Sequence, residues 1–129
     1  MTTTAFSVDF ATPMPGLAPH TAFGLEEVDG ADGLYALRAR ESDVRLFLLD
    51  PRVVDDAYAP PIPGAALAEV GAEADEVRVF VVANPGDDGV SLNLRAPVVV
   101  HKDSGRAVQV ILEDASYPIR ALLGSPRED

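Results

Sequence analysis

The sequence predicts a mostly β protein: a small β-barrel or barrel-like sandwich of antiparallel strands with one short helix. Short apolar runs follow one another along the chain, and several of them alternate apolar with polar residues, which is typical of strands. Residues that favour turns separate these runs, and a single window favours a helix. Apolar residues make up 47% of the 129 residues, which is enough for a packed core.

The N-terminal half predicts four strands. Alternation over residues 6–10 places Phe6, Val8 and Phe10 on one buried face. Three further strands are expected over residues 22–28, 34–39 and 44–49. The last of these is almost entirely apolar, which favours a strand covered on both faces.

The middle of the chain favours a loop followed by a short helix. Residues 55–64 contain Pro60, Pro61 and Pro63, which exclude regular structure there. Residues 65–70 favour one or two helical turns, and Gly71 predicts their end.

The C-terminal half gives the clearest strand pattern. Strands are expected over residues 77–83, 90–94, 98–100 and 108–112, with a turn over 84–89 and a hairpin loop over 102–105. Pro97 precedes the third of these strands, where a proline is tolerated. About six to eight short strands with little helix favour a closed or partly closed barrel, or a sandwich.

Length and composition indicate a single domain over residues 1–129, with a core at about 5–123 and loose termini. The chain has no Cys, so it can form neither a disulfide nor a thiolate metal site. Residues 1–10 lack the basic start and apolar stretch of a signal peptide, and no apolar run approaches the roughly 18 residues of a membrane span. We therefore expect a cytoplasmic protein without membrane contact. The residue patterns do not fix the oligomeric state, for which a monomer is the expectation.

The formal net charge of −11 disfavours direct binding to nucleic acid, because such binding needs clustered basic residues. Lys102 is the only lysine, and the arginines are scattered. An acidic surface suits a basic protein partner, but charge alone favours the simpler explanation that acidity keeps the protein soluble.

The residue patterns predict no catalytic, cofactor-binding or metal-binding residues, and hence no enzyme. His20 and His101 have no acidic or histidine partner at ligand spacing. Ser91 lacks the second glycine of a nucleophile elbow. Residues 87–89 are weakly similar to a calcium loop, but Val98 stands where the bidentate acid would be needed.

Several segments together resemble the flagellar assembly factor FliW family. They are Asn93–Val100, Gln109–Asp114, Tyr117–Arg120, Pro15–Leu17, Phe47–Pro51 and Tyr58. Each is weak alone, but their order and spacing together are specific, and the resemblance spans roughly residues 5–123. The chain departs from the family pattern at residues 34–39, where an aromatic-rich strand is common, and at His101, where asparagine is common. The segment 57–77 is also short.

The resemblance implies a small β-barrel that regulates by switching partners. FliW-like proteins bind CsrA, an RNA-binding repressor of translation, and relieve its repression of flagellin mRNA; they also bind flagellin. The partners implied here are therefore CsrA and flagellin, with no cofactor. The residues expected at the partner-facing surface are Tyr58, Asn93, Glu113, Asp114 and Tyr117. An alternative for the last three is structural: Tyr117 closes the barrel, and the two acids end the strand toward water.

Two other functions remain open from the sequence. A small-molecule-binding or enzymatic β-barrel unrelated to flagella would need a pocket with converging polar groups, and barrels this small are usually filled by their own side chains. A nucleic-acid-binding barrel is disfavoured by the charge.

Overall fold

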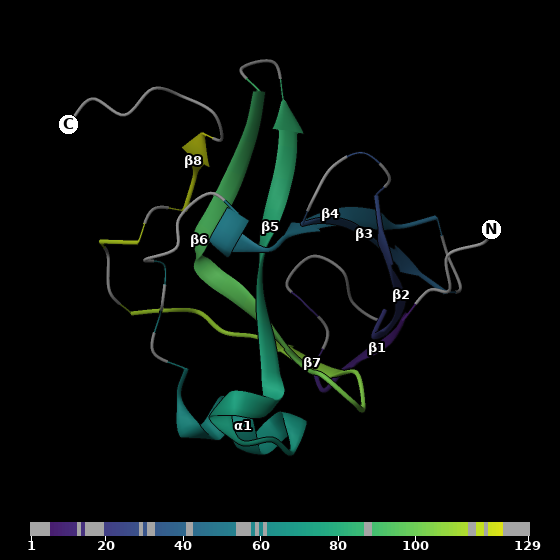
Figure 1. Cartoon of the computed structure of the whole chain (residues 1–129), viewed down its shortest axis with the longest axis vertical. Coiled ribbons are helices and arrows are strands. Elements are labelled where there is room, and N and C mark those ends of the chain that lie inside the picture. Colours follow the sequence, from purple (N-terminus) through teal and green to yellow (C-terminus); the bar gives the residue numbers. More distant parts are fainter. Residues whose placement is uncertain are drawn as a thin grey trace.

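A computed structural model describes residues 6–12, 14, 20–28, 30, 33–40, 43–53, 58, 60, 62–86, 89–113, 116–117 and 119–122. The elements in chain order are β1 (Phe6–Phe10), β2 (Ala22–Glu27), β3 (Leu34–Ala39), β4 (Arg45–Leu49), the 3-10 turn η1 (Pro51–Val53), α1 (Gly64–Val70), the 3-10 turn η2 (Ala74–Glu76), β5 (Val77–Gly86), β6 (Gly89–His101), β7 (Arg106–Gln109) and β8 (Ala121–Leu122). The mostly β fold with one short α-helix is confirmed (Figure 1).

Strands β1 to β7 close into a barrel in chain order, each antiparallel to the next. The closing pair differs from the expected antiparallel arrangement, because β1 and β7 run parallel, with Asp9 opposite Arg106 and Phe10 opposite Ala107. The reason is parity: in a meander with an odd number of strands, the first and last strands point the same way. Strand β8 lies outside this circle and pairs with the first half of β6.

Alternate side chains from the strands fill the barrel interior. The buried residues of this hydrophobic core are Val8, Phe10, Met14, Phe23, Leu25, Leu37, Ala39, Leu48, Phe80, Val98, Val100 and Ala107. The rings of Phe10 and Phe23 meet edge to face, with centroids 5.5 Å apart. Phe6 was expected on the same buried face but is 36% exposed, since it begins β1 and lies at the rim of the barrel.

Helix α1 covers the outer face of β6 and β7. Ala66 and Val70 pack there against Val99, Val108 and Val110. The helix ends as predicted at Gly71, whose positive φ of 68° suits glycine at a helix C-terminus. Strands β6 and β7 thus have apolar contacts on both faces.

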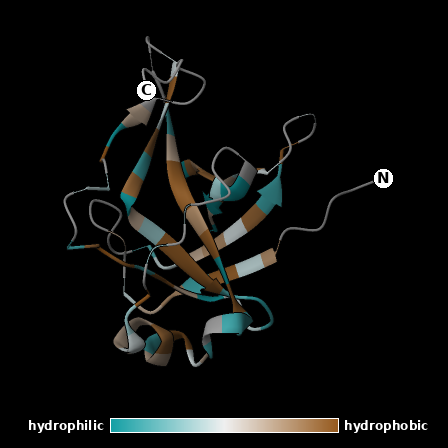
Figure 2. Ribbon diagram, turned by 60° about the vertical axis from the view of Figure 1, so that its left-hand side comes forward, coloured by the Kyte–Doolittle hydropathy of each residue, from teal (hydrophilic) through white to brown (hydrophobic). Residues whose placement is uncertain are grey.

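The β5–β6 hairpin is longer than the sequence suggested. The ladder continues to the pair Gly86 and Gly89, so part of the expected turn belongs to the strands. The two strands expected over 90–94 and 98–100 form one strand, β6, with Pro97 inside it. The hairpin projects past the other strands at the end away from α1 (Figure 1). Hydrophobic residues continue along much of both strands (Figure 2), and those on one face form a separate cluster with Leu49 and Tyr58.

Candidate functional site

A wide bulge interrupts β6 where the family-like Asn-Leu-Arg-Ala-Pro segment lies. In the ladder with β5, Phe80 pairs with Val98, but Val82 already pairs with Asn93. Residues 94–97 therefore stand opposite Val81 alone, and their backbone groups need partners other than β5.

The Asn93 side chain is one of the hydrogen-bond partners that replace β5 at the bulge. Its Oδ1 atom accepts hydrogen bonds from the backbone N–H groups of Arg95 at 3.1 Å and Ala96 at 3.2 Å. The next residue, Pro97, has no N–H to satisfy. A buried proline inside a long strand is tolerated here because the ladder is already broken at this point.

The carbonyl groups of the bulge bind segments from elsewhere in the chain. Leu94 accepts a hydrogen bond from the Tyr58 hydroxyl at 2.7 Å, and Ala96 accepts one from the Gln109 side-chain amide at 3.1 Å. The Arg95 carbonyl accepts the N–H of Leu112 at 2.8 Å, and the Pro97 carbonyl accepts the N–H of Val110 at 2.9 Å. The bulge thus binds both Tyr58 and the segment after β7.

Two tyrosines pack beside the bulge. The rings of Tyr58 and Tyr117 are perpendicular, with centroids 5.8 Å apart. The Arg95 Nε donates to the Tyr117 carbonyl at 2.8 Å, which ties this segment to β6. Burial, together with the neighbouring Tyr117, raises the pKa of the Tyr58 hydroxyl above its usual value. Tyr58 therefore remains a neutral hydrogen-bond donor at physiological pH.

The structure brings three of the five expected site residues together. Tyr58, Asn93 and Tyr117 meet at the bulge, where their polar groups or rings contact the protein itself. Glu113 is exposed to solvent, and Asp114 lies outside the described residues. The inward contacts of Tyr117 fit the structural alternative for that residue, whereas the exposure of Glu113 leaves it accessible to a partner.

Comparison with known proteins identifies the family. The family model described as "FliW protein" matches residues 2–123. Flagellar assembly factor FliW from Thermotoga maritima is 33% identical over 98 residues, which is 73% of this chain and 66% of that protein. The protein of the same name from Syntrophotalea carbinolica is 34% identical over 107 residues, or 83% of this chain and 70% of the relative.

The chain belongs to the FliW family. It spans just under two thirds of the length of its Thermotoga relatives. A crystal structure of the flagellar assembly factor FliW superposes with a TM-score of 0.84 at 21% identity, covering 95% of this chain and 88% of the other. The barrel is therefore the FliW fold, and the family-like residues Asn93 and Pro97 are explained by the bulge they build.

His101, a departure from the usual FliW asparagine, caps the β6–β7 turn. Its Nδ1 atom accepts hydrogen bonds from the backbone N–H groups of Asp103 at 3.0 Å and Ser104 at 3.3 Å. These donors lie two and three residues ahead, which is the same relation that Asn93 has to Arg95 and Ala96. Because an asparagine oxygen can accept both bonds, the asparagine that the resemblance led us to expect at this position could cap the turn in the same way.

Sequence reasoning missed two exposed isoleucines that lie near Glu113 and Tyr117 in the sequence. Ile111 is 63% exposed and Ile119 is 59% exposed, the largest such values among the large apolar side chains described. Alternation could have revealed Ile111, because it lies between Val110 and Leu112, which both face the core. Glu113 follows on the same side as Ile111. We call Ile111, Glu113 and Ile119 the isoleucine–glutamate surface.

In the described part of the chain, no group of His, Asp or Glu side chains is arranged to hold a metal ion. None of the helices described is long and apolar enough to cross a membrane.

Proposed function

We propose that this FliW family member is a cytoplasmic flagellar assembly factor that works by binding other proteins. It binds the translational repressor CsrA, which relieves repression of flagellin mRNA, and it binds flagellin as chaperone and sensor. Family membership supports the role in flagellar assembly. The observation that carries the binding mode is the exposure of Ile111 and Glu113 on a segment that the N–H groups of Val110 and Leu112 hold to β6.

Burial of the exposed isoleucines by a partner would contribute to the free energy of binding. A fully exposed isoleucine gains about 1.5–3 kcal/mol when it is buried. Single exposed apolar residues are ordinary, but Ile111 lies between two backbone hydrogen bonds, from Val110 and Leu112 to β6, which limit its motion. Less conformational entropy is therefore lost when a partner covers it.

Within the residues that the structure describes, one edge of the backbone of the same segment has no hydrogen-bonded neighbour. The N–H groups of Val110 and Leu112 point to β6, so the alternating geometry of a strand turns that of Ile111 the other way. Among the described residues, nothing accepts a hydrogen bond from the Ile111 N–H. A strand from a partner could add to this edge, which is a common mode of peptide recognition.

Charge favours a basic partner at this surface. Glu113 is exposed beside Ile111, and the whole chain carries a net charge of −11. Opposite charge speeds the encounter of two proteins at low salt, and Lys or Arg groups at the rim of the interface would meet Glu113. CsrA, as an RNA-binding protein, fits this requirement.

The test measures binding of purified CsrA and flagellin from the source organism by biolayer interferometry. Ile111→Ala together with Ile119→Ala should weaken binding of at least one partner about tenfold, or ~1.4 kcal/mol. Glu113→Lys should slow association with CsrA and reduce its salt dependence. Glu69→Lys, an equal charge change on the exposed face of α1, is the matched control and should have little effect.

Two outcomes would contradict the proposal in different ways. If the wild-type chain binds neither CsrA nor flagellin, the function is wrong. If binding is intact and all three substitutions leave it within threefold of wild type, while the thermal midpoint is unchanged, the partner binds elsewhere on the barrel.

A further inference from the structure

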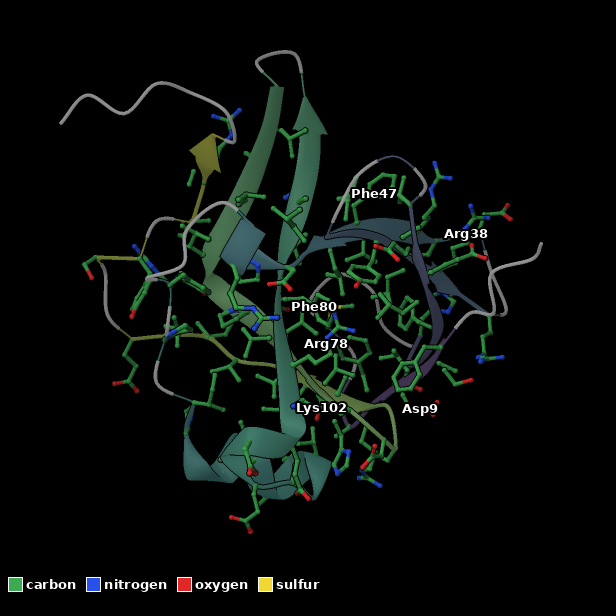
Figure 3. The ribbon with its side chains drawn as sticks, in the orientation of Figure 1. Asp9, Arg38, Phe47, Arg78, Phe80 and Lys102 are labelled. Atoms are coloured by element: carbon green, nitrogen blue, oxygen red, sulfur yellow. The ribbon has the colours of Figure 1, made fainter. Side chains whose placement is uncertain are left out.

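Arg78 places a guanidinium group at one end of the barrel interior. It lies two residues before Phe80 on β5, so both side chains point to the face that also carries Val98 and Val100. Figure 3 shows Arg78 and Phe80 together on the side of β5 nearest β1–β4, with Lys102 closer to α1. Arg78 is half-buried.

Aromatic rings hold this guanidinium in place. Its central carbon lies 4.7 Å from the Phe80 ring centroid and 5.3 Å from that of Tyr35. Nη2 donates to the Tyr35 hydroxyl at 3.0 Å. These contacts orient a planar charged group without neutralising it.

A cavity of about 290 Å³ opens beside Arg78. Its apolar lining comes from Phe6, Leu25, Tyr35, Phe80 and Val100, and its polar lining from Glu27, Arg78, His101 and Lys102. A neighbouring cavity of about 340 Å³ shares Arg78 and Lys102 with it. Lys102, the single lysine of this acidic chain, and Arg78 therefore both line the two cavities.

Three side chains present N–H donors there. Within the described residues, no carboxylate lies within ion-pair distance of Arg78. Lys102 Nζ uses one proton on the Asp75 carbonyl at 3.0 Å, which leaves two. His101 Nδ1 accepts backbone N–H groups, so the neutral ring carries its proton on Nε2.

Among the described residues, neither Asp50 nor Glu27 is within ion-pair distance of Arg78 or Lys102. Asp50, which lines the neighbouring cavity, already pairs with Arg52 at 3.1 Å. Its hydrogen bond with the Arg52 side chain is the main reason that the pKa of this carboxyl lies below its usual value, and the charge of Arg78 also helps to lower this pKa. Glu27 is the acidic residue in the lining of the cavity beside Arg78.

We propose that this cavity binds a carboxylate carried by a small apolar group. The guanidinium group can donate two parallel hydrogen bonds to the two oxygens of a carboxylate, and the aromatic rings of the lining can pack against the apolar group. The net charge of −11 and the nearby Glu27 favour a single negative charge over a doubly charged phosphate. The volume is at the low end for ligand sites, so it suits a group the size of one amino-acid residue.

The carboxylate can come from a free acid or from the C-terminus of a peptide. N-acetyl-leucine and N-acetyl-leucinamide, titrated by calorimetry, isolate the contribution of the charge. N-acetyl-Ala-Ala-leucine adds the peptide arm. A site for a peptide terminus should bind this longer probe more tightly, whereas a closed small-molecule site should bind it more weakly.

We expect N-acetyl-leucine to bind at least tenfold more tightly than its amide. Arg78→Gln should remove most of this difference, and Lys102→Gln, a change at an exposed side chain, should reduce it severalfold. Arg38→Gln removes a positive charge outside the cavity lining and should leave the difference intact. Lys102→Gln keeps the test valid if Arg78→Gln fails to fold.

The proposal is overturned if acid and amide bind equally or not at all, or if Arg38→Gln reduces acid binding as much as Lys102→Gln does. It does not depend on partner binding, because the isoleucine–glutamate surface and this cavity share no residue.

Discussion

Replacing Asn93 with alanine should destabilise the barrel, because it removes the acceptor that two backbone N–H groups of the bulge use. Each such hydrogen bond contributes about 0.5–1.5 kcal/mol, and a buried donor left without a partner costs about 1–3 kcal/mol. Ala96 is 5% exposed, so water cannot easily replace the lost acceptor at its N–H. We expect a loss of about 2–3 kcal/mol in the free energy of unfolding.

Urea unfolding followed by far-ultraviolet circular dichroism measures this loss directly. For a chain of this length the melting temperature should fall by roughly 5–10 °C. Asn93→Asp is the control, because its carboxylate can accept the same two bonds, and it should retain most of the stability. A loss below about 0.5 kcal/mol in Asn93→Ala, within the range of an ordinary surface substitution, would refute this account of the bulge.

The β6–β7 turn yields two further predictions. Gly105→Ala should lower the free energy of unfolding by about 2–4 kcal/mol, because φ is +80° and a Cβ there would overlap the Ser7 carbonyl. Gly64→Ala is the control and should have little effect, because a Cβ there would meet open space. Equal melting temperatures for these two variants would contradict the close approach of the turn to β1. His101→Ala should lower the free energy of unfolding by about 1 kcal/mol, because it removes the acceptor of two backbone N–H groups, whereas His101→Asn should stay within about 0.5 kcal/mol of wild type. If asparagine destabilises as much as alanine does, the shared turn chemistry is wrong.

The sequence predicted most strands because local periodicity and turn residues define them. β3 has the predicted bounds, and α1 ends at the predicted glycine. β6 was divided in two because Pro97 usually marks a strand end, and the ladder interruption that admits it depends on the register with β5. The parallel β1–β7 pair is likewise a property of closure, which no local pattern contains.

The candidate site was only partly accessible to sequence reasoning. The sequence singled out Tyr58, Asn93 and Tyr117, but it could not say that all three are at the bulge or that the two tyrosine rings contact each other. Ile119 lies outside the alternating strand patterns, so the sequence did not predict its exposure. The Arg78 cavity joins residues from several strands, and its rings come from positions that the sequence assigned to the core alone.

The contacts at the bulge indicate that Asn93 and Arg95 hold the segment after β7 in place, and the proposed partner contacts lie on that segment. Arg95 accepts the N–H of Leu112 through its carbonyl and donates through Nε to the Tyr117 carbonyl. Both ends of the segment that carries Glu113 are therefore anchored to the bulge, while Ile111 and Glu113 face solvent. A change at Asn93 should then weaken partner binding only as far as it loosens this segment, so that binding recovers when temperature is lowered. A change at Ile111 or Glu113 should weaken binding at every temperature at which the barrel is folded.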